Sequence, residues 1–162
     1  MGKKYDSASA ADLLALKALG CTNLRLRQLM RRVAQHYDVE MAKAGLKTTQ
    51  YSLLSHVLKL GPVRPGDLAK SMKVSASTLT RNLKPLVDAG WVALAAGSDA
   101  RSRSVVITAA GHSKRDEARR FWKVAQESLN TLLGAGRVLA LHAVINESME
   151  LLAEDDVADA DE

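Results

Sequence analysis

Short hydroxyls and long cations are concentrated in one stretch of the chain, between residues 75 and 84. Hydroxyl groups and the lysine ammonium can hydrogen-bond to phosphate oxygens, and an arginine guanidinium can bind the edge of a guanine through two hydrogen bonds. Residues of these types at this spacing are therefore expected to contact double-stranded DNA. The candidate contact residues are Ser75, Ser77, Thr78, Thr80, Arg81 and Lys84.

These side chains are carried by a predicted helix over residues 76–88. Its leucines, Leu79, Leu83 and Leu86, recur at i, i+4 and i+7, which is the spacing of a stripe buried against a core. The cations then lie on the opposite face. Ser75 fits the N-cap position, because its hydroxyl can accept a hydrogen bond from an unpaired amide of the first turn. Taken alone, the segment also fits an ordinary amphipathic helix with a solvated polar face.

A shorter helix is predicted just before it, over residues 67–72, followed by a turn at Lys73 and Val74. Ala69 has a small side chain, which lets two helices approach closely across a turn of this length. The pattern indicates a helix-turn-helix. Pro85 removes one amide donor from the second helix and is expected to bend it beyond Arg81 and Lys84.

Two strand-like runs follow, at residues 91–94 and 105–108, both rich in aromatic or β-branched residues. The residues between them include Gly97 and Asp99 as turn formers. Arginine is the side chain that gains most from the negative potential of a narrow minor groove. A hairpin with arginines near its tip, directly after a helix-turn-helix, predicts a DNA-binding wing. Its candidate contact residues are Arg101 and Arg103.

The chain now shows a family resemblance. The residues that carry it read L-A-x-x-M-x-V-S-x-S-T-L-T-R, then Gly-Trp-Val, then D-A-R-S-R-S-V-V-I-T-A-A-G. They resemble the winged-helix core of the MarR family of bacterial transcription regulators, and the flanking helices extend the resemblance over residues 12–153. The resemblance implies a mainly α fold with a small β-hairpin wing, in which N- and C-terminal helices form the dimerisation region.

Outer helices are predicted over residues 11–43, where Gly20 can interrupt the helix, over 109–133, where Thr108 can act as the cap, and over 137–153. Between them, Thr48 or Thr49 can cap a helix that ends at Gly61-Pro62, and Val63-Arg64 can form a minor third strand beside the wing.

The outer helices predict a homodimer independently, because they carry more apolar surface than one winged-helix core can cover. A two-fold dimer places two recognition helices roughly 34 Å apart and predicts a palindromic operator. The expected organisation is a flexible arm at 1–10, a helical dimerisation region at 11–46 and 109–153, a winged helix-turn-helix DNA-binding domain at 47–108 and an acidic disordered tail at 154–162.

Charge supports a polyanionic partner. The net charge is +5, but the last nine residues, EDDVADADE, hold six acidic side chains, and setting these aside raises the charge of the remainder to +11. The single cysteine is consistent with a reducing cytoplasm. The sequence contains no uninterrupted run of about 18 apolar residues, so no membrane span is expected.

Cys21 is the candidate sensor residue, because Arg25 one helical turn away could stabilise its thiolate. The organic-hydroperoxide branch of the family that the chain resembles senses oxidants with a cysteine early in its first helix. Cys21 lies slightly ahead of that position, by less than one turn. The competing interpretation is a small buried hydrophobic residue.

His36 and Tyr37 on the first helix and His56 on the second could line a pocket for a small-molecule effector; the resemblance implies anionic aromatic ligands. Each could equally be a core or surface residue. No histidine pair or histidine–cysteine pair has ligand spacing, so neither a metal nor another cofactor is expected. The phosphate-cradling, dinucleotide, zinc-protease and nucleophile-elbow motifs are also missing, so an enzyme is not expected.

The sequence therefore predicts a sequence-specific DNA-binding transcription regulator. The expected form is a dimeric repressor of a palindromic operator, released by a small-molecule ligand or by modification of Cys21. The alternative is an architectural protein that binds DNA without specificity and without a signal input.

Overall fold

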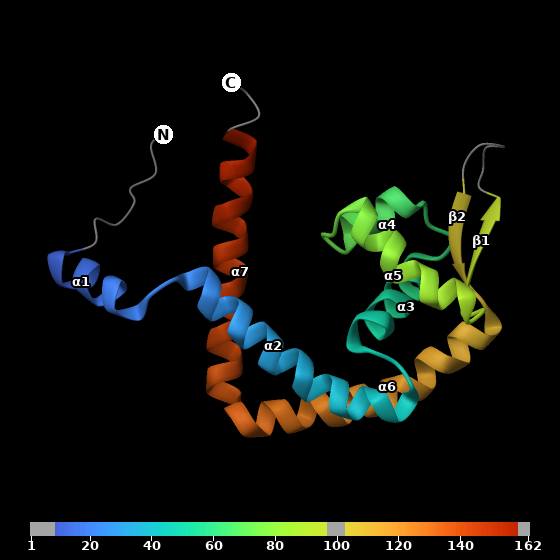
Figure 1. Cartoon of the computed structure of the whole chain (residues 1–162), viewed down its shortest axis with the longest axis horizontal. Coiled ribbons are helices and arrows are strands. Elements are labelled where there is room, and N and C mark those ends of the chain that lie inside the picture. Colours follow the sequence, from blue (N-terminus) through green and yellow to red (C-terminus); the bar gives the residue numbers. More distant parts are fainter. Residues whose placement is uncertain (1–8, 97–102, 159–162) are drawn as a thin grey trace. The chain divides into compact units, whose positions relative to one another are not determined.

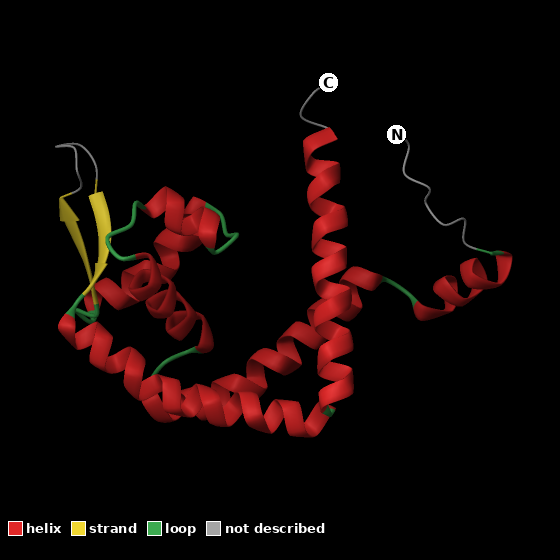
Figure 2. Cartoon of the chain, turned by 180° about the vertical axis from the view of Figure 1, so that it is seen from behind, coloured by secondary structure: helices red, strands yellow, loops and turns green. Residues whose placement is uncertain are grey.

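The computed structural model describes residues 9–96 and 103–158. The described chain is built from helices and one hairpin (Figures 1 and 2). It divides into two compact units, Met1–Gln35 and His36–Glu162. The first holds α1 (Ala10–Leu19) and most of α2 (Thr22–Met41), and the second holds all later elements.

In the first unit, α1 begins at a capping box. Ser9 Oγ accepts from the amide of Asp12 at 3.2 Å, and the Asp12 carboxylate accepts from the amide of Ser9 at 3.0 Å. This bonding lowers the pKa of the Asp12 carboxyl. Gly20, at φ 78°, ends the helix, which confirms the predicted interruption. The flexible arm was predicted over 1–10, but α1 already includes Ala10, and residues 1–8 lie outside the described chain.

A 3₁₀ turn, η1 (Ala42–Ala44), connects α2 to α3 (Thr48–Leu60). The turn ends at Gly45, which has φ 65°. A threonine was predicted to cap α3, and this is wrong. Asp38 on α2 accepts from both the amide and the hydroxyl of Thr48, at 2.9 and 2.7 Å. The Thr48 hydroxyl thus donates to a carboxylate of the neighbouring helix instead of accepting from an amide of its own first turn, and Lys47 occupies the N-cap position.

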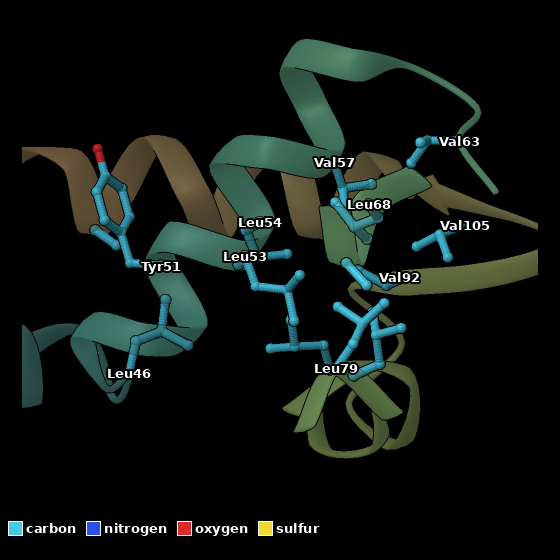
Figure 3. Close-up of a cluster of buried hydrophobic side chains, with 14 of the residues drawn as sticks. Leu46, Tyr51, Leu53, Leu54, Val57, Val63, Leu68, Leu79, Val92 and Val105 are labelled. Atoms are coloured by element: carbon cyan, nitrogen blue, oxygen red, sulfur yellow. The ribbon is translucent and has the colours of Figure 1, made fainter. Parts of the chain in front are cut away.

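Helix α3 is followed by α4 (Pro65–Ser71), α5 (Ala76–Asp88), β1 (Val92–Ala96) and β2 (Arg103–Ile107). These elements lie in the segment predicted as the winged-helix domain, residues 47–108. The strands pair antiparallel, and Val63 forms the predicted third-strand contact as a bridge to Val105. The core is a cluster of apolar side chains, mainly from α3 and these elements, which Met41, Ala44, Leu46 and Ala118 extend beyond residues 47–108 (Figure 3). Leu53, Leu54, Leu68, Leu86 and Val105 are fully buried.

A tight joint attaches the hairpin to α6 (Ala109–Leu133). Thr108 Oγ1 accepts from the amide of Gly111 at 3.0 Å and donates to the carbonyl of Gly90 at 2.7 Å. A Cβ at Gly111 would lie 1.9 Å from the carbonyl oxygen of Trp91, so only glycine fits there. The predicted cap at Thr108 is confirmed, and it fixes the direction in which α6 leaves the hairpin.

Helix α6 packs along α3, and Trp122 stacks on Tyr51 with ring centroids 5.9 Å apart. Ala118 of α6 is buried in the same core. The last helix, α7, spans Ala135–Ala158 and so enters the segment predicted as a disordered tail. No single described helix is long and apolar enough to cross a bilayer; α6 and α7 pass that test only as a pair bent by 101°.

Candidate nucleic-acid interface

The helix-turn-helix lies where it was predicted. Helix α4 ends at Ser71, and the amide of Val74 donates back to the carbonyl of the buried Ala69 at 3.0 Å. Lys73 has φ 52°, a left-handed conformation that L residues seldom adopt. The turn between the helices therefore stores some backbone strain while it directs α5 across α4.

Helix α5 has two sharply different faces. Leu79, Leu83 and Leu86 are buried in the core, as the spacing predicted. The opposite face exposes Ser77, Thr80, Arg81, Lys84 and Asp88. The helix is continuous through Pro85, and the amide of Ala89 still donates to the Pro85 carbonyl at 3.1 Å.

The hydroxyls at the start of α5 form a small network. Ser75 Oγ accepts from the amide of Thr78 at 3.2 Å and lies 2.9 Å from Thr78 Oγ1 and 3.0 Å from Ser77 Oγ. The predicted N-cap is confirmed. Thr80 donates its hydroxyl to the carbonyl of Ala76 at 2.9 Å, which leaves its lone pairs as acceptors for a ligand.

The two cations of α5 differ in their partners. Lys84 Nζ lies 2.8 Å from Asp88 Oδ2, and both side chains are more than half exposed. Such a surface pair contributes only about 0.3–0.5 kcal/mol, so a phosphate can replace it. Arg81 is exposed and makes no hydrogen bond or ion pair within the described residues. Its five N–H donors are therefore available to an incoming base edge or phosphate.

The hairpin is longer toward its tip than predicted and shorter at its base. Trp91 and Thr108 were predicted as strand residues, but they form the joint with α6, where the Thr108 amide donates to the Trp91 carbonyl at 3.1 Å. Arg103, opposite Ala96, is the exposed first residue of β2. The other predicted wing residues, Gly97, Asp99 and Arg101, lie outside the described chain.

Cys21 is exposed, so its interpretation as a buried hydrophobic residue does not hold within this chain. Its carbonyl accepts from the Arg25 amide at 3.1 Å, the first backbone bond of α2. The exposed Arg25 side chain lies one turn further along the same helix. Within the described residues no hydrogen bond joins the Cys21 thiol to the Arg25 guanidinium, so the proposed stabilisation of the thiolate stays a prediction.

The candidate effector residues form hydrogen bonds to other groups of the same chain. His36 Nε2 lies 3.2 Å from the carbonyl of Ala125, and Tyr37 donates to Gln126 Oε1 at 2.6 Å, so both residues attach α2 to α6. Burial raises the pKa of the Tyr37 hydroxyl. His56 instead contacts the carbonyl of Ser52, one turn back on α3, at 2.8 Å. No hydrogen bond or ring contact joins His56 to the other two among residues 9–96 and 103–158.

His56 borders a shallow hollow of about 470 Å³ between α3 and α6. Sequence reasoning missed its principal cation, Arg115, whose side chain is only 19% exposed. The guanidinium donates from Nε to Ser55 Oγ at 3.4 Å and lies 6.0 Å from the centre of the Tyr51 ring. Arg115 also pairs with the neighbouring Asp116, with Nη1 2.9 Å from Oδ1. No local pattern marks its contact with Ser55, because that residue lies 60 positions earlier. Within the described part of the chain, no group of His, Cys, Asp and Glu could hold a metal.

Comparisons with known proteins agree on one family. A model of the MarR family matches residues 44–102. The chain is 30% identical over 93 residues to the HTH-type transcriptional regulator YwoH from Bacillus subtilis (strain 168), which covers 57% of this chain and 68% of the relative.

Solved structures extend the similarity to most of the chain. The M. tuberculosis transcriptional regulator MosR in complex with DNA has a TM-score of 0.68 and 31% identity, covering 80% of this chain and 96% of that one. A mutant MarR from E. coli complexed with operator DNA has a TM-score of 0.71 at 20% identity, over 77% and 91%. The second likeness shows the shared fold.

Proposed function

The chain belongs to the MarR family of transcription regulators, and on that premise we propose that it is a dimeric repressor of a palindromic operator. Its family makes it a DNA-binding regulator rather than an enzyme. The proposal adds the dimer, the symmetry of the operator and a release step driven by a small-molecule ligand or by modification of Cys21. It acts in the cytoplasm and requires no cofactor.

The two-faced helix α5 is the observation that carries the proposal. Its leucines fix it to the core, so the exposed face keeps one orientation. In the proposed complex α5 lies in the major groove, where Arg81 binds a guanine edge and Ser77, Thr80 and Lys84 bind phosphates or neighbouring bases. Ser75 and Thr78 hold the first turn in place and present its amides to the DNA backbone.

The wing is proposed to follow the DNA into the adjacent minor groove. Arg103 begins β2 on the exposed side of the hairpin, and Arg101 belongs to the tip by sequence. The joint at Thr108 and Gly111 ties the hairpin to α6. A shift of α6 would therefore move the wing as well as α5.

The proposed dimer explains why the outer helices remain apolar on their surface. We assign residues 11–46 and 109–153 to the dimerisation region. Exposed large apolar side chains are frequent there, and one chain does not cover them. They include Leu13, Leu14, Leu16, Leu19, Leu26, Met30, Leu132, Leu139, Ile145, Met149 and Leu152. A two-fold axis through such an interface gives the two α5 helices the separation of about one DNA turn.

Release is proposed to act on the contacts that position the winged-helix domain. The hollow beside His56 is lined by two further basic side chains, Lys59 and Arg115, which suit an anionic ligand. A ligand bound there would compete with the Arg115–Ser55 bond and so alter the packing of α3 on α6. His36 and Tyr37, which bind α6, would transmit the change to α2.

Selection of operators from a random duplex library tests the proposal. The expected result is one palindromic sequence, bound at least about 10³-fold more tightly than random DNA. Equal affinity for all duplexes would favour the architectural alternative. For the Cys21 branch, peroxide should release the operator from the wild type but not from Cys21→Ser; equal release from both would remove that branch and leave the ligand branch standing.

A further inference from the structure

The first part of α2 exposes an arginine face, of which the proposed function uses only Arg25, as the neighbour of Cys21. Arg25, Gln28, Arg31, Arg32 and Gln35 occupy i, i+3, i+6, i+7 and i+10, which places them on one side of a helix. All five are exposed, and the last four line a surface hollow of about 580 Å³. These five residues form the arginine face.

No acidic residue balances this charge locally. The sequence from Thr22 to Tyr37 contains four arginines and no carboxylate. One arginine outside the face, Arg27, donates to Asn23 at 3.3 Å, whereas the guanidiniums of the face have no hydrogen bond or ion pair within the described residues. The charge is therefore uncompensated along four turns of helix.

The arrangement is also unfavourable for α2 itself. The helix begins at Thr22, so Arg25 lies in its first turns, where the positive end of the helix dipole repels a cation. Arg27 and Arg31 are like charges at i and i+4, a spacing that costs about 0.2–0.5 kcal/mol. An anionic partner would offset both terms.

We propose that the arginine face binds the acidic C-terminal segment, residues 154–162, of a second copy of this chain. The segment carries six carboxylates in nine residues, and carboxylates form paired hydrogen bonds with guanidinium groups. The inference rests on the proposed dimer, which brings N- and C-terminal helices of two copies into one interface. This contact supplies the anion within the assembly, at a ratio of one segment to one face.

The contact also gives the acidic segment a role in DNA binding. Six carboxylates near the proposed α5 face would repel phosphates, whereas carboxylates paired with arginines are neutralised. Pairing the segment with the arginine face therefore keeps the winged-helix domain the most positive surface of the dimer.

The first experiment neutralises the segment without shortening it. All six acidic residues of 154–162 are changed to the corresponding amides, and the dimer dissociation constant is measured by analytical ultracentrifugation. The control changes Glu147 and Glu150 to Gln on the same helix. At low salt we expect roughly tenfold weaker dimerisation for the neutral segment alone, and the difference should vanish near 1 M salt, where charges more than about 3 Å apart are screened.

The second side of the contact is tested with Arg31→Gln/Arg32→Gln. Combined with the neutral segment, it should add no further loss, because both changes remove the same interaction. A dimer whose affinity ignores both changes would overturn the inference and leave the proposed dimer intact. A wild type that stays monomeric would overturn both. If only the arginine variant loses DNA affinity, with a smaller salt dependence, the face binds phosphates and the inference is wrong.

Cross-linking then identifies the copy that provides the segment. On a Cys21→Ser background, Gln28→Cys and Ala160→Cys are combined and treated with a mild oxidant. We expect a covalent dimer on a non-reducing gel, with a lower yield in high salt and none from either single cysteine. A covalent monomer, or equal dimer formation by Gln28→Cys alone, would overturn the assignment to a second copy.

Discussion

Helices α5 and α7 differ in where their large apolar side chains lie, in the core or on the surface of the chain. Helix α5 buries its three leucines within its own chain and exposes its cations. Helix α7 has nearly twice the length, yet none of its described residues is fully buried, and Leu139, Ile145 and Met149 lie on its surface. The winged-helix domain thus buries its apolar side chains within one chain, whereas the last helix leaves apolar side chains exposed, which the proposed dimer would bury.

Substitutions in the buried core of the winged-helix domain should reduce the stability of the fold more than substitutions on α7. Leu54→Ala removes a fully buried side chain that packs between the helices of the winged-helix domain, and it should destabilise the fold by about 2–5 kcal/mol. Chemical denaturation measures this loss. The matched substitution Leu139→Ala, at a leucine that is 72% exposed, should change the stability of the monomer by less than about 0.5 kcal/mol. Similar losses for the two would contradict the contrast between the regions.

Substitution of the exposed apolar residues of α7 should weaken dimerisation rather than destabilise the monomer. Leu139→Gln combined with Ile145→Gln removes apolar area from α7 while keeping its helical tendency. We expect the dimer dissociation constant to rise by roughly 100-fold or more, since each of the two apolar side chains buried at the interface contributes about 1.5 kcal/mol or more. Sedimentation over a range of concentrations measures the change.

A charged position on the same helix provides the control. Glu150→Gln alters α7 without removing apolar surface, and it should leave dimerisation unchanged. If the double variant also leaves the dimer intact, then α7 is not part of the interface, and the exposed leucines need another explanation.

On the exposed face of α5, the two cations should behave differently. Arg81→Ala should cost about 1–3 kcal/mol at one or two base positions of the operator and relax specificity there. Lys84→Ala should weaken binding to all DNA sequences alike, and it should reduce the slope of log affinity against log salt concentration by about one, the contribution of one phosphate contact. Binding to a panel of single-base operator variants separates the two outcomes, with the exposed Arg119→Ala on α6 as a control for charge alone.

A uniform loss for Arg81→Ala would make it a phosphate contact and leave the source of specificity elsewhere. The difference between the two cations matters because Lys84 already has Asp88 as a partner, whereas Arg81 has none among the described residues.

The sequence predicted the winged-helix domain well because its signals are local. The bounds of α5, the cap at Ser75 and the burial of Leu79, Leu83 and Leu86 all follow from residues within one helix of each other. The predicted cap at Thr108 holds for the same reason, because its hydroxyl accepts from the amide of Gly111 three residues later. Local periodicity and capping can be recognised in such elements without knowledge of any tertiary contact.

Contacts between residues far apart in sequence could not be predicted. Asp38 replaces the expected threonine cap of α3, and Arg115 reaches Ser55 across two helices. The strand ends were also misplaced, because Ala95 and Ala96 have weak strand tendency and are held in β1 by pairing with β2. The candidate effector residues were named without their partners for the same reason.

The smallest expected effect concerns the turn that joins the two helices of the DNA-binding motif. Lys73 has φ 52°, where a side chain costs about 1–2 kcal/mol and glycine costs far less. Lys73→Gly should therefore stabilise the domain by about 0.5–1 kcal/mol after the greater chain entropy of glycine is subtracted. Lys70→Gly, inside α4, should instead destabilise it by about 1 kcal/mol. Thermal unfolding of the two variants tests the sign. A loss at both positions would mean that the Lys73 side chain contributes more to the turn than its backbone strain costs, which would place a stabilising contact where the described structure has none.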